Sequence, residues 1–319
     1  MENMKVTQEM VDSFLITKNL DFNVEMVPTY GKVDGEYKEL DAYVPMRTDN
    51  NEFLSKGGLS KDFVPIQNRD AFRVITQMAG VTNIELKNGG QWGGGVGVFA
   101  QISLGDMNIG NGGDKVGKYL SVVNSHDGSR ALNILITPYR YVCMNQIAKS
   151  INHANKGENQ IISIRHNSSA DERIEQLIHT VSIANEAFEQ SEETYNKLAN
   201  LKINEEYVKE TLQRLFPLNH TEGRGKTIWE NNIKAVRDRY MSADRGRIER
   251  GTAWNLYNAI QGTYQHDSRN SSNKNQSVLV GTIAKQSSNA LSAVLEICSS
   301  EHIPHTVQAE IDAMINGNF

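Results

Sequence analysis

The sequence has few of the features that mark secreted or membrane proteins. It contains only two cysteines in 319 residues, Cys143 and Cys298, with no CxxC pair and no zinc spacing, so we expect buried thiols. No run of about 18 apolar residues occurs, which predicts that no segment spans a membrane. Residues 1–10 are polar and lack the apolar stretch of a signal peptide, which predicts a cytosolic protein.

The sequence also lacks a strong excess of one charge. Its formal net charge is −5, whereas a general DNA-coating protein of the histone type would be basic. Charge is nevertheless uneven along the chain: residues 171–210 hold ten acids and four bases, and residues 222–250 hold eight bases and five acids. The simplest interpretation of both segments is a solvated helix face, and the alternative is a binding surface.

The first half of the chain has the pattern of an antiparallel sheet. Short apolar runs alternate with turn residues, and the Asp127-Gly128 pair between two such runs predicts a hairpin turn. Residues 68–80 have the apolar spacing of a helix, with Asn68 as a candidate N-cap. We expect a further helix to begin after Pro138.

The second half has helical spacing throughout, beginning with a capping-box pattern at Ser169. The two halves together predict an α+β fold, with an N-terminal, mainly antiparallel β-sheet and packed helices followed by a helical C-terminal region. We expect an N-terminal extension over residues 1–40, an α+β sheet domain over 41–155 and a mainly helical region that packs on the sheet over 156–319.

His126 and Asp127 admit several interpretations. The simplest is a turn in which both side chains satisfy local hydrogen bonds beside Gly128 and shape a site. A metal site would need further His and Asp residues in a paired motif, and none is visible. A hydrolase pair of His126 with Ser125 or Ser129 lacks a nucleophile elbow, and Cys143 is a weaker candidate nucleophile. We therefore predict no metal and no cofactor, and keep a nuclease or hydrolase that uses His126 and Asp127 as an alternative.

The glycine-rich stretch GGQWGGGVG, residues 89–97, is neither a P-loop nor a dinucleotide fingerprint, because no Gly-Lys-Ser/Thr follows and no helix begins there. Its glycines favour a strand with a close backbone neighbour. Trp92 within it is a candidate for stacking on a nucleic-acid base.

Basic and aromatic residues are interleaved around the predicted sheet, which is the combination that a single-stranded nucleic-acid groove needs. The candidate nucleic-acid contacts are Lys118, Arg130, Arg140, Arg165, Trp92 and Tyr139. The alternative is an ordinary hairpin face with partly buried basic side chains. A second basic patch, which could instead be a network of ion pairs, comprises Arg237, Arg239, Arg245, Arg247 and Arg250.

Four segments in this order resemble the phage/plasmid-like protein family, which is carried by phages, plasmids and integrated elements and is classed as a domain of unknown function. They are FVPIQNRDAF, NSHDGSRALNILITPYRYVCMNQI, IRHNSS and RGTAWNLYNAIQGTYQH. The resemblance implies a mobile-element origin and the host cytoplasm. The order of elements from Asn68 to Ile151 is also similar to single-strand annealing proteins of the Red beta and RecT type, which implies a basic groove for single-stranded DNA and assembly into oligomers.

These observations support three hypotheses. The first is a DNA-transactions protein that binds single-stranded DNA, promotes strand annealing and forms a homo-oligomer. The second is a protein-interaction factor, such as a host-defence inhibitor or virion accessory protein, that binds a host or phage protein through its acidic helices. The third is the enzyme that uses His126 and Asp127.

Overall fold

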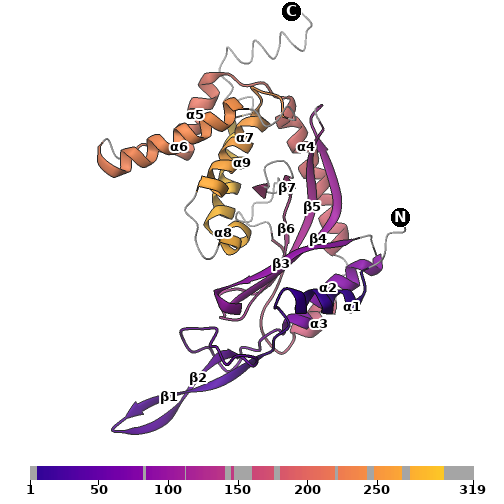
Figure 1. Cartoon of the computed structure of the whole chain (residues 1–319), viewed down its shortest axis with the longest axis vertical. Coiled ribbons are helices and arrows are strands. Elements are labelled where there is room, and N and C mark those ends of the chain that lie inside the picture. The colour runs from indigo at the N-terminus through magenta and orange to yellow at the C-terminus, as the bar shows by residue number, and fades with distance from the viewer. Residues whose placement is uncertain are drawn as a thin grey trace, which may run out of the picture.

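The computed structural model describes residues 6–81, 84–111, 113–140, 145–146, 160–175, 180–219, 222–242, 248–267 and 274–297. The fold is α+β, as predicted: antiparallel sheets with helices come first, and a helical region follows (Figure 1). Cys143 and Cys298 lie outside the described residues. None of the helices in the described ranges combines the length and the apolar character that crossing a membrane requires.

Two strands form a hairpin of their own near the N-terminus. Helix α1 (Gln8–Thr17) is followed by β1 (Val24–Val33) and β2 (Glu36–Arg47), which form a two-stranded sheet. Near its base, β2 also forms isolated bridges from Tyr43 to Leu59 and from Met46 to Phe53. The tight turn between them places Asp34 and Gly35 at positive φ values of 53° and 88°. This hairpin projects from the body of the molecule and includes residues on both sides of position 40 (Figure 1).

The main sheet has the order β3-β4-β5-β6-β9 and is antiparallel throughout. Its strands are β3 (Glu85–Trp92), β4 (Gly97–Ile109), β5 (Asp114–Ser125), β6 (Leu132–Ile136) and β9 (Gln160–Ile164). The predicted β5–β6 hairpin is confirmed, but its loop spans residues 126–131 and is wider than a two-residue turn. The helix expected directly after Pro138 is wrong at its start, because β7 (Tyr139–Arg140) pairs with β5 and β8 (Asn145–Gln146).

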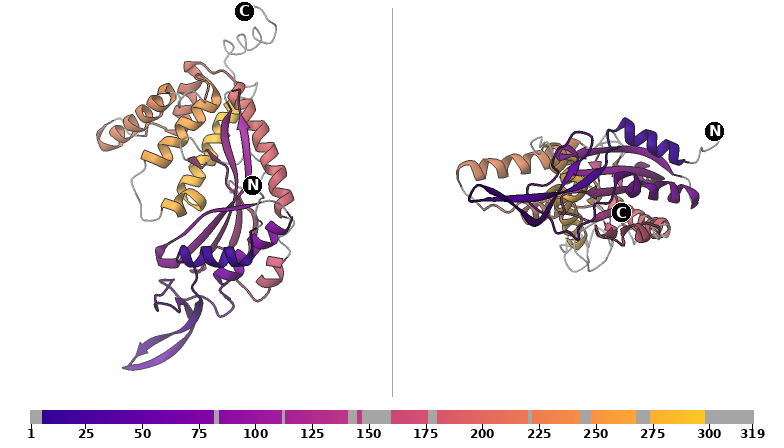
Figure 2. Two further views of the ribbon diagram at one scale, coloured as in Figure 1. Left: turned by 45° about the vertical axis from the view of Figure 1, so that its right-hand side comes forward. Right: turned by 90° about the horizontal axis from the view of Figure 1, so that it is seen from below.

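Helices cover the sheet from both sides (Figures 1 and 2). On one side α2 (Asn68–Val81) contacts β4 and β5, and α3 (Ala170–Glu175) and α4 (Thr180–Asn200) extend this layer. Apolar side chains of alternate strand residues, such as Ala100, Ile102 and Val122, pack against these helices in the main core. On the other side α8 (Lys274–Val280) contacts β3, and its Leu279 joins a smaller apolar cluster.

The helical region is built from α5 (Glu205–Leu215), α6 (Gly223–Ser242), α7 (Ala253–Gly262), α8 and α9 (Thr282–Ile297). A π-helical segment, Thr263–Asp267, continues α7. Helix α7 is buried along its whole length, and Trp254 within it packs against Tyr195 of α4 with the rings tilted by 33° and their centroids 5.0 Å apart. This contact joins the helical region to the layer that covers the sheet.

Candidate functional site

Three segments that are distant in sequence meet beside the first turn of α2, at residues 59–68, 124–130 and 165–169. The backbone N–H of Ile66 donates to Nδ1 of His166 at 3.2 Å, and Val64 donates its N–H to the His166 carbonyl at 3.2 Å. Asn124 donates from Nδ2 to the carbonyl of Ile66 at 2.9 Å. We call this meeting point the motif junction.

His126 lies inside the motif junction and is fully buried. Its Nε2 is 2.9 Å from Oδ1 of Asn68, whose Nδ2 donates to the Leu20 carbonyl. Because the amide oxygen of Asn68 accepts, the hydrogen of the neutral imidazole lies on Nε2. The side chain of Asn68 therefore links Leu20, in the loop after α1, to His126 at the end of β5, and it does not act as the predicted N-cap.

Asp127 points the other way. One of its carboxylate oxygens accepts from the Ser125 hydroxyl at 2.8 Å and from the Ser129 backbone N–H at 3.0 Å. Since His126 points into the protein and Asp127 closes its own loop, the two groups diverge, and they lack the shared reacting point that a catalytic pair needs. Gly128 adopts a φ of +74° and lies against Leu59, so this loop also packs on the 59–68 segment.

The two histidines of the junction titrate abnormally for a common reason. Burial, strengthened by the nearby His166, lowers the pKa of His126 to about 3. Burial also lowers the pKa of His166 to about 4, and its ring stacks on Phe63 with centroids 4.9 Å apart. Neutral, packed imidazoles of this kind serve as structural hydrogen-bonding groups at neutral pH.

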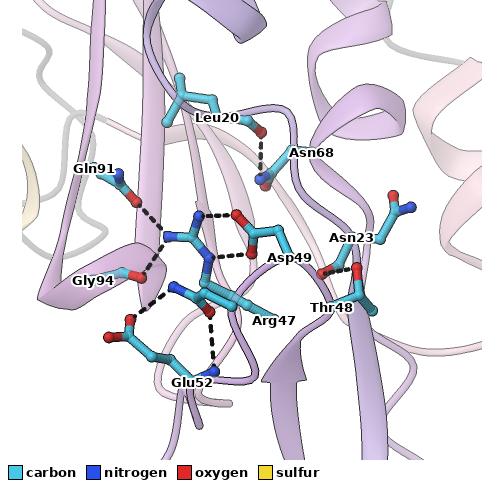
Figure 3. Close-up of polar contacts among 10 residues, drawn as sticks. Leu20, Asn23, Arg47, Thr48, Asp49, Glu52, Asn68, Gln91 and Gly94 are labelled. Carbon is cyan, nitrogen blue, oxygen red and sulfur yellow. Dashed lines mark hydrogen bonds and ion pairs between the residues drawn. The ribbon is translucent and has the colours of Figure 1, made fainter.

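Arg47 fixes the base of the N-terminal hairpin next to the junction (Figure 3). Its guanidinium makes two hydrogen bonds to the Asp49 carboxylate, of 2.9 and 2.6 Å, and a third of 2.8 Å to the Gly94 carbonyl. It also lies 3.9 Å from the ring centroid of Phe22, a cation–π contact. Val24 on the neighbouring strand β1 is held by the side chain of Gln67. The backbone N–H of Val24 donates to Oε1 of Gln67 at 2.9 Å, and Nε2 of Gln67 donates to the Val24 carbonyl at 3.0 Å.

The predicted basic groove is only partly assembled. Arg130 and Arg165 both lie at the motif junction with exposed or half-exposed side chains. Lys118 is half-buried and lies roughly 23 Å along β5 from the junction end at Ser125, at about 3.3 Å per residue. Arg140 is a correction: its side chain is fully buried and paired with Asp114, so it is closed to a phosphate.

The predicted stacking residues are also placed differently from expectation. Trp92 is 4% exposed and packs against Phe99, so it presents no ring face to a base. The reason is the close approach that the glycine-rich stretch allows, since the indole lies directly over Gly97. Tyr139 is half-buried, with its ring edge-on to Tyr119 at 5.8 Å.

Replacing Gly97 by alanine is expected to lower the free energy of unfolding by about 1–3 kcal/mol, as overpacking does in other cores. An added methyl group would lie 2.1 Å from two atoms of the Trp92 ring, so the indole has to move. Chemical denaturation measures the loss. Gly57→Ala is the matched control, because nothing lies within 4 Å of its added methyl group. Equal stability of both variants would contradict this packing.

Sequence reasoning missed two cations of the junction. Lys56 and Lys61 are exposed and lie in the segment that leads into it. None of the charged groups of Lys56, Lys61, Arg130 and Arg165 forms an ion pair with another residue of the described ranges. The only signal in the sequence is that both lysines lie close to the FVPIQNRDAF segment. The three segments of the junction meet only in the tertiary fold.

The second basic patch is only partly described. Arg237 pairs with Glu205 of α5 at 3.1 Å, and Arg239 packs against Gly262 of α7. Arg250 is exposed, and Arg245 and Arg247 lie outside the described residues. Helix packing therefore already uses part of this patch.

The acidic helices also make contacts within the chain. Glu192 of α4 accepts the backbone N–H of Asn108 at the end of β4, at 3.1 Å. Asn196, one turn later, accepts the N–H of Gly110 at 2.8 Å. These side chains satisfy the end of the β4–β5 hairpin, which gives part of the acidic segment a structural role.

Within the described ranges, no three His, Cys, Asp or Glu side chains are grouped so that they could hold a metal ion. Comparison with known proteins gives one match: a family model described as "Domain of unknown function (DUF932)" matches residues 57–291. A search of curated proteins and a search of solved structures found no match. The matched range contains all three segments of the motif junction and begins after the N-terminal hairpin.

Proposed function

This chain belongs to the DUF932 family, a domain of unknown function, and we propose that it binds single-stranded DNA through the surface of the motif junction. The observation that carries the proposal is the set of exposed or half-exposed cations at the junction that lack ion-pair partners among the described residues. They are Lys56, Lys61, Arg130 and Arg165, and we call them the junction cations. Their charges are available to phosphates, the main source of affinity for nucleic acids.

The surroundings of the junction cations support this proposal. Phe53, three residues before Lys56, is 62% exposed, and Phe63, two residues after Lys61, is half-buried on the ring of His166. These rings are candidates for base stacking. The acid nearest to Arg130 in sequence, Asp127, already accepts hydrogen bonds from Ser125 and Ser129. In this account His126, Asp127 and Gly128 hold the shape of the surface and take no part in chemistry.

The order α2-β3-β4-β5 supports the further proposal that the protein promotes strand annealing, as a homo-oligomer, in the cytoplasm of a host that carries it on a mobile element. Annealing needs two strands held with their bases accessible, which phosphate contacts and stacking allow. It requires no cofactor. If DNA binding proves absent, binding of a host or phage protein through the acidic helices becomes the leading hypothesis.

The direct test is a variant with alanine at Lys61, Arg130 and Arg165. Its affinity for a labelled single-stranded oligonucleotide of mixed sequence is expected to fall at least about tenfold at low salt, because three phosphate contacts are removed. Fluorescence anisotropy measures the affinity. The matched control carries alanine at Lys197, Lys209 and Lys285, which are exposed helical bases with the same summed charge. An equal loss of affinity in both variants would mean that only the net charge of the protein matters. Unchanged affinity in both variants would refute the proposed site.

A further inference from the structure

The β1–β2 hairpin is a long ribbon that stands away from the body in Figure 1 and in the left view of Figure 2. We call residues 24–46 the arm. Its outer part carries large exposed apolar side chains, with Tyr37 73% and Tyr30 53% exposed and Val33 and Leu40 about half exposed. The pairing register places the two tyrosines on one face of the ribbon, and Val33 and Leu40 on the other.

An isolated ribbon of this kind is not stable on its own. A two-stranded hairpin is at best marginally stable in water, and both edges of this one are unpaired along most of their length. Its base is nevertheless held firmly by Arg47 and Gln67, so the arm is presented in one direction and not left as a tail. Exposed apolar residues on a projecting, anchored element mark a surface that another chain covers.

The charge of the arm restricts its partner. It contains five acidic and two basic residues, a formal net charge of −3. This charge repels the phosphates of a nucleic acid, so the partner surface of the arm is a basic protein surface with apolar residues.

Helix α6 is such a surface, and it lies at the opposite end of the molecule from the arm (Figure 1). It contains five basic and two acidic residues, a net charge of +3. Ile228 and Met241 on it are 50% and 67% exposed. Three of its cations form ion pairs near the surface, but exposed pairs contribute only about 0–1 kcal/mol and can exchange partners.

We propose that the arm of one molecule docks on helix α6 of a second copy of this chain. The arm cannot reach the α6 of its own chain, because its base is fixed at the other end of the molecule. The contact therefore joins two different surfaces head to tail. Two copies that exchange arms reciprocally form a two-fold dimer, whereas copies that each pass the arm to the next one form a closed ring or a filament. This inference does not rest on the proposed DNA binding.

A charge-swap experiment tests the contact. The arm variant is Glu36→Lys with Glu39→Lys, and the α6 variant is Arg224→Glu with Lys234→Glu; all four side chains are exposed. The native chain is expected to have a mass of two or more chains in sedimentation velocity, and each variant alone the mass of one chain. The protein that carries both changes is expected to reassemble, because the charges are again complementary.

Each result decides the proposal. A native protein that stays monomeric across a concentration series would overturn it, as would assembly that survives both separate variants or that the combined variant fails to restore. Far-ultraviolet circular dichroism checks that each variant is folded. Tyr37→Ser with Leu40→Ser removes the apolar part of the contact and is expected to dissociate the assembly at unchanged charge. The variant with alanine at Lys61, Arg130 and Arg165 is expected to keep the mass of the native assembly. The arm contact and the DNA-binding surface are therefore tested independently.

Discussion

Replacing Asp114 by alanine is expected to lower the free energy of unfolding by about 3–5 kcal/mol. Its carboxylate accepts Nε of Arg140 at 2.5 Å and the indole N–H of Trp254 at 3.0 Å, and both charged side chains are 1% exposed. Without Asp114 the buried guanidinium of Arg140 loses this carboxylate, and removing one partner of a buried ion pair is the costly case. The contact joins β5 and β7 of the sheet to α7, so its loss also loosens the helical region.

Urea unfolding followed by tryptophan fluorescence measures this loss. The variant Asp114→Leu with Arg140→Met removes both charges and is expected to recover much of the stability, because a buried pair can be replaced by apolar residues of similar volume. Glu210→Ala, an exposed acid on α5, is expected to change stability by no more than about 0.5 kcal/mol. A loss at Asp114 as small as the loss at Glu210 would contradict the burial of this pair.

Lowering the pH from 7.5 to 5 is expected to destabilise the protein by roughly 4 kcal/mol through His126 and His166 together. Their pKa values in the folded protein, about 3 and about 4, lie below the ordinary value of 6.5. Well above pH 6.5 both imidazoles are neutral in the folded and in the unfolded chain, so they do not lower the free energy of unfolding there. Below pH 6.5 the two imidazoles become protonated in the unfolded chain but stay neutral in the folded chain. The free energy of unfolding therefore falls as the pH falls toward 4.

The pH dependence of His126→Gln separates this effect from the titration of the carboxylates. Gln keeps a donor for Asn68 but does not titrate, so the variant is expected to lose about half of the difference in stability between pH 7.5 and 5. His166→Gln is expected to lose a similar share. Urea unfolding at the two pH values is the measurement. If both variants show the native difference, the two imidazoles are not the buried neutral groups described above.

The sequence was sufficient to predict the elements whose signal is local. Helix α2 was predicted from apolar spacing, and the β5–β6 hairpin from the Asp127-Gly128 pair. The first strand and the turn of the arm were missed although Asp34-Gly35 is the same kind of turn signal, because the strands mix charged and apolar residues on both faces. Without a clean alternation, residues 1–40 were interpreted as an extension.

The candidate site could not be predicted from the local sequence, because it depends on contacts between residues that are distant in sequence. Arg140 has the sequence context of an exposed base, but its partner Asp114 lies 26 residues earlier and only strand pairing brings the two together. Trp92 is buried because Gly97, on the neighbouring strand, leaves room for its ring. Conversely, Lys61 belongs to the same junction as Arg130 and Arg165 only because the 59–68 segment contacts both of their loops.

The salt dependence of DNA binding is the most direct test of a phosphate-binding surface at the motif junction. For single strands, the logarithm of the affinity falls with the logarithm of salt concentration by about 0.7 for each phosphate contact. We expect salt-sensitive binding by the native protein, and a slope that is shallower by about 2 when Lys61, Arg130 and Arg165 are alanine. A slope that is the same in both proteins, or no binding by the folded native protein at low salt, would contradict a phosphate-binding surface at the motif junction.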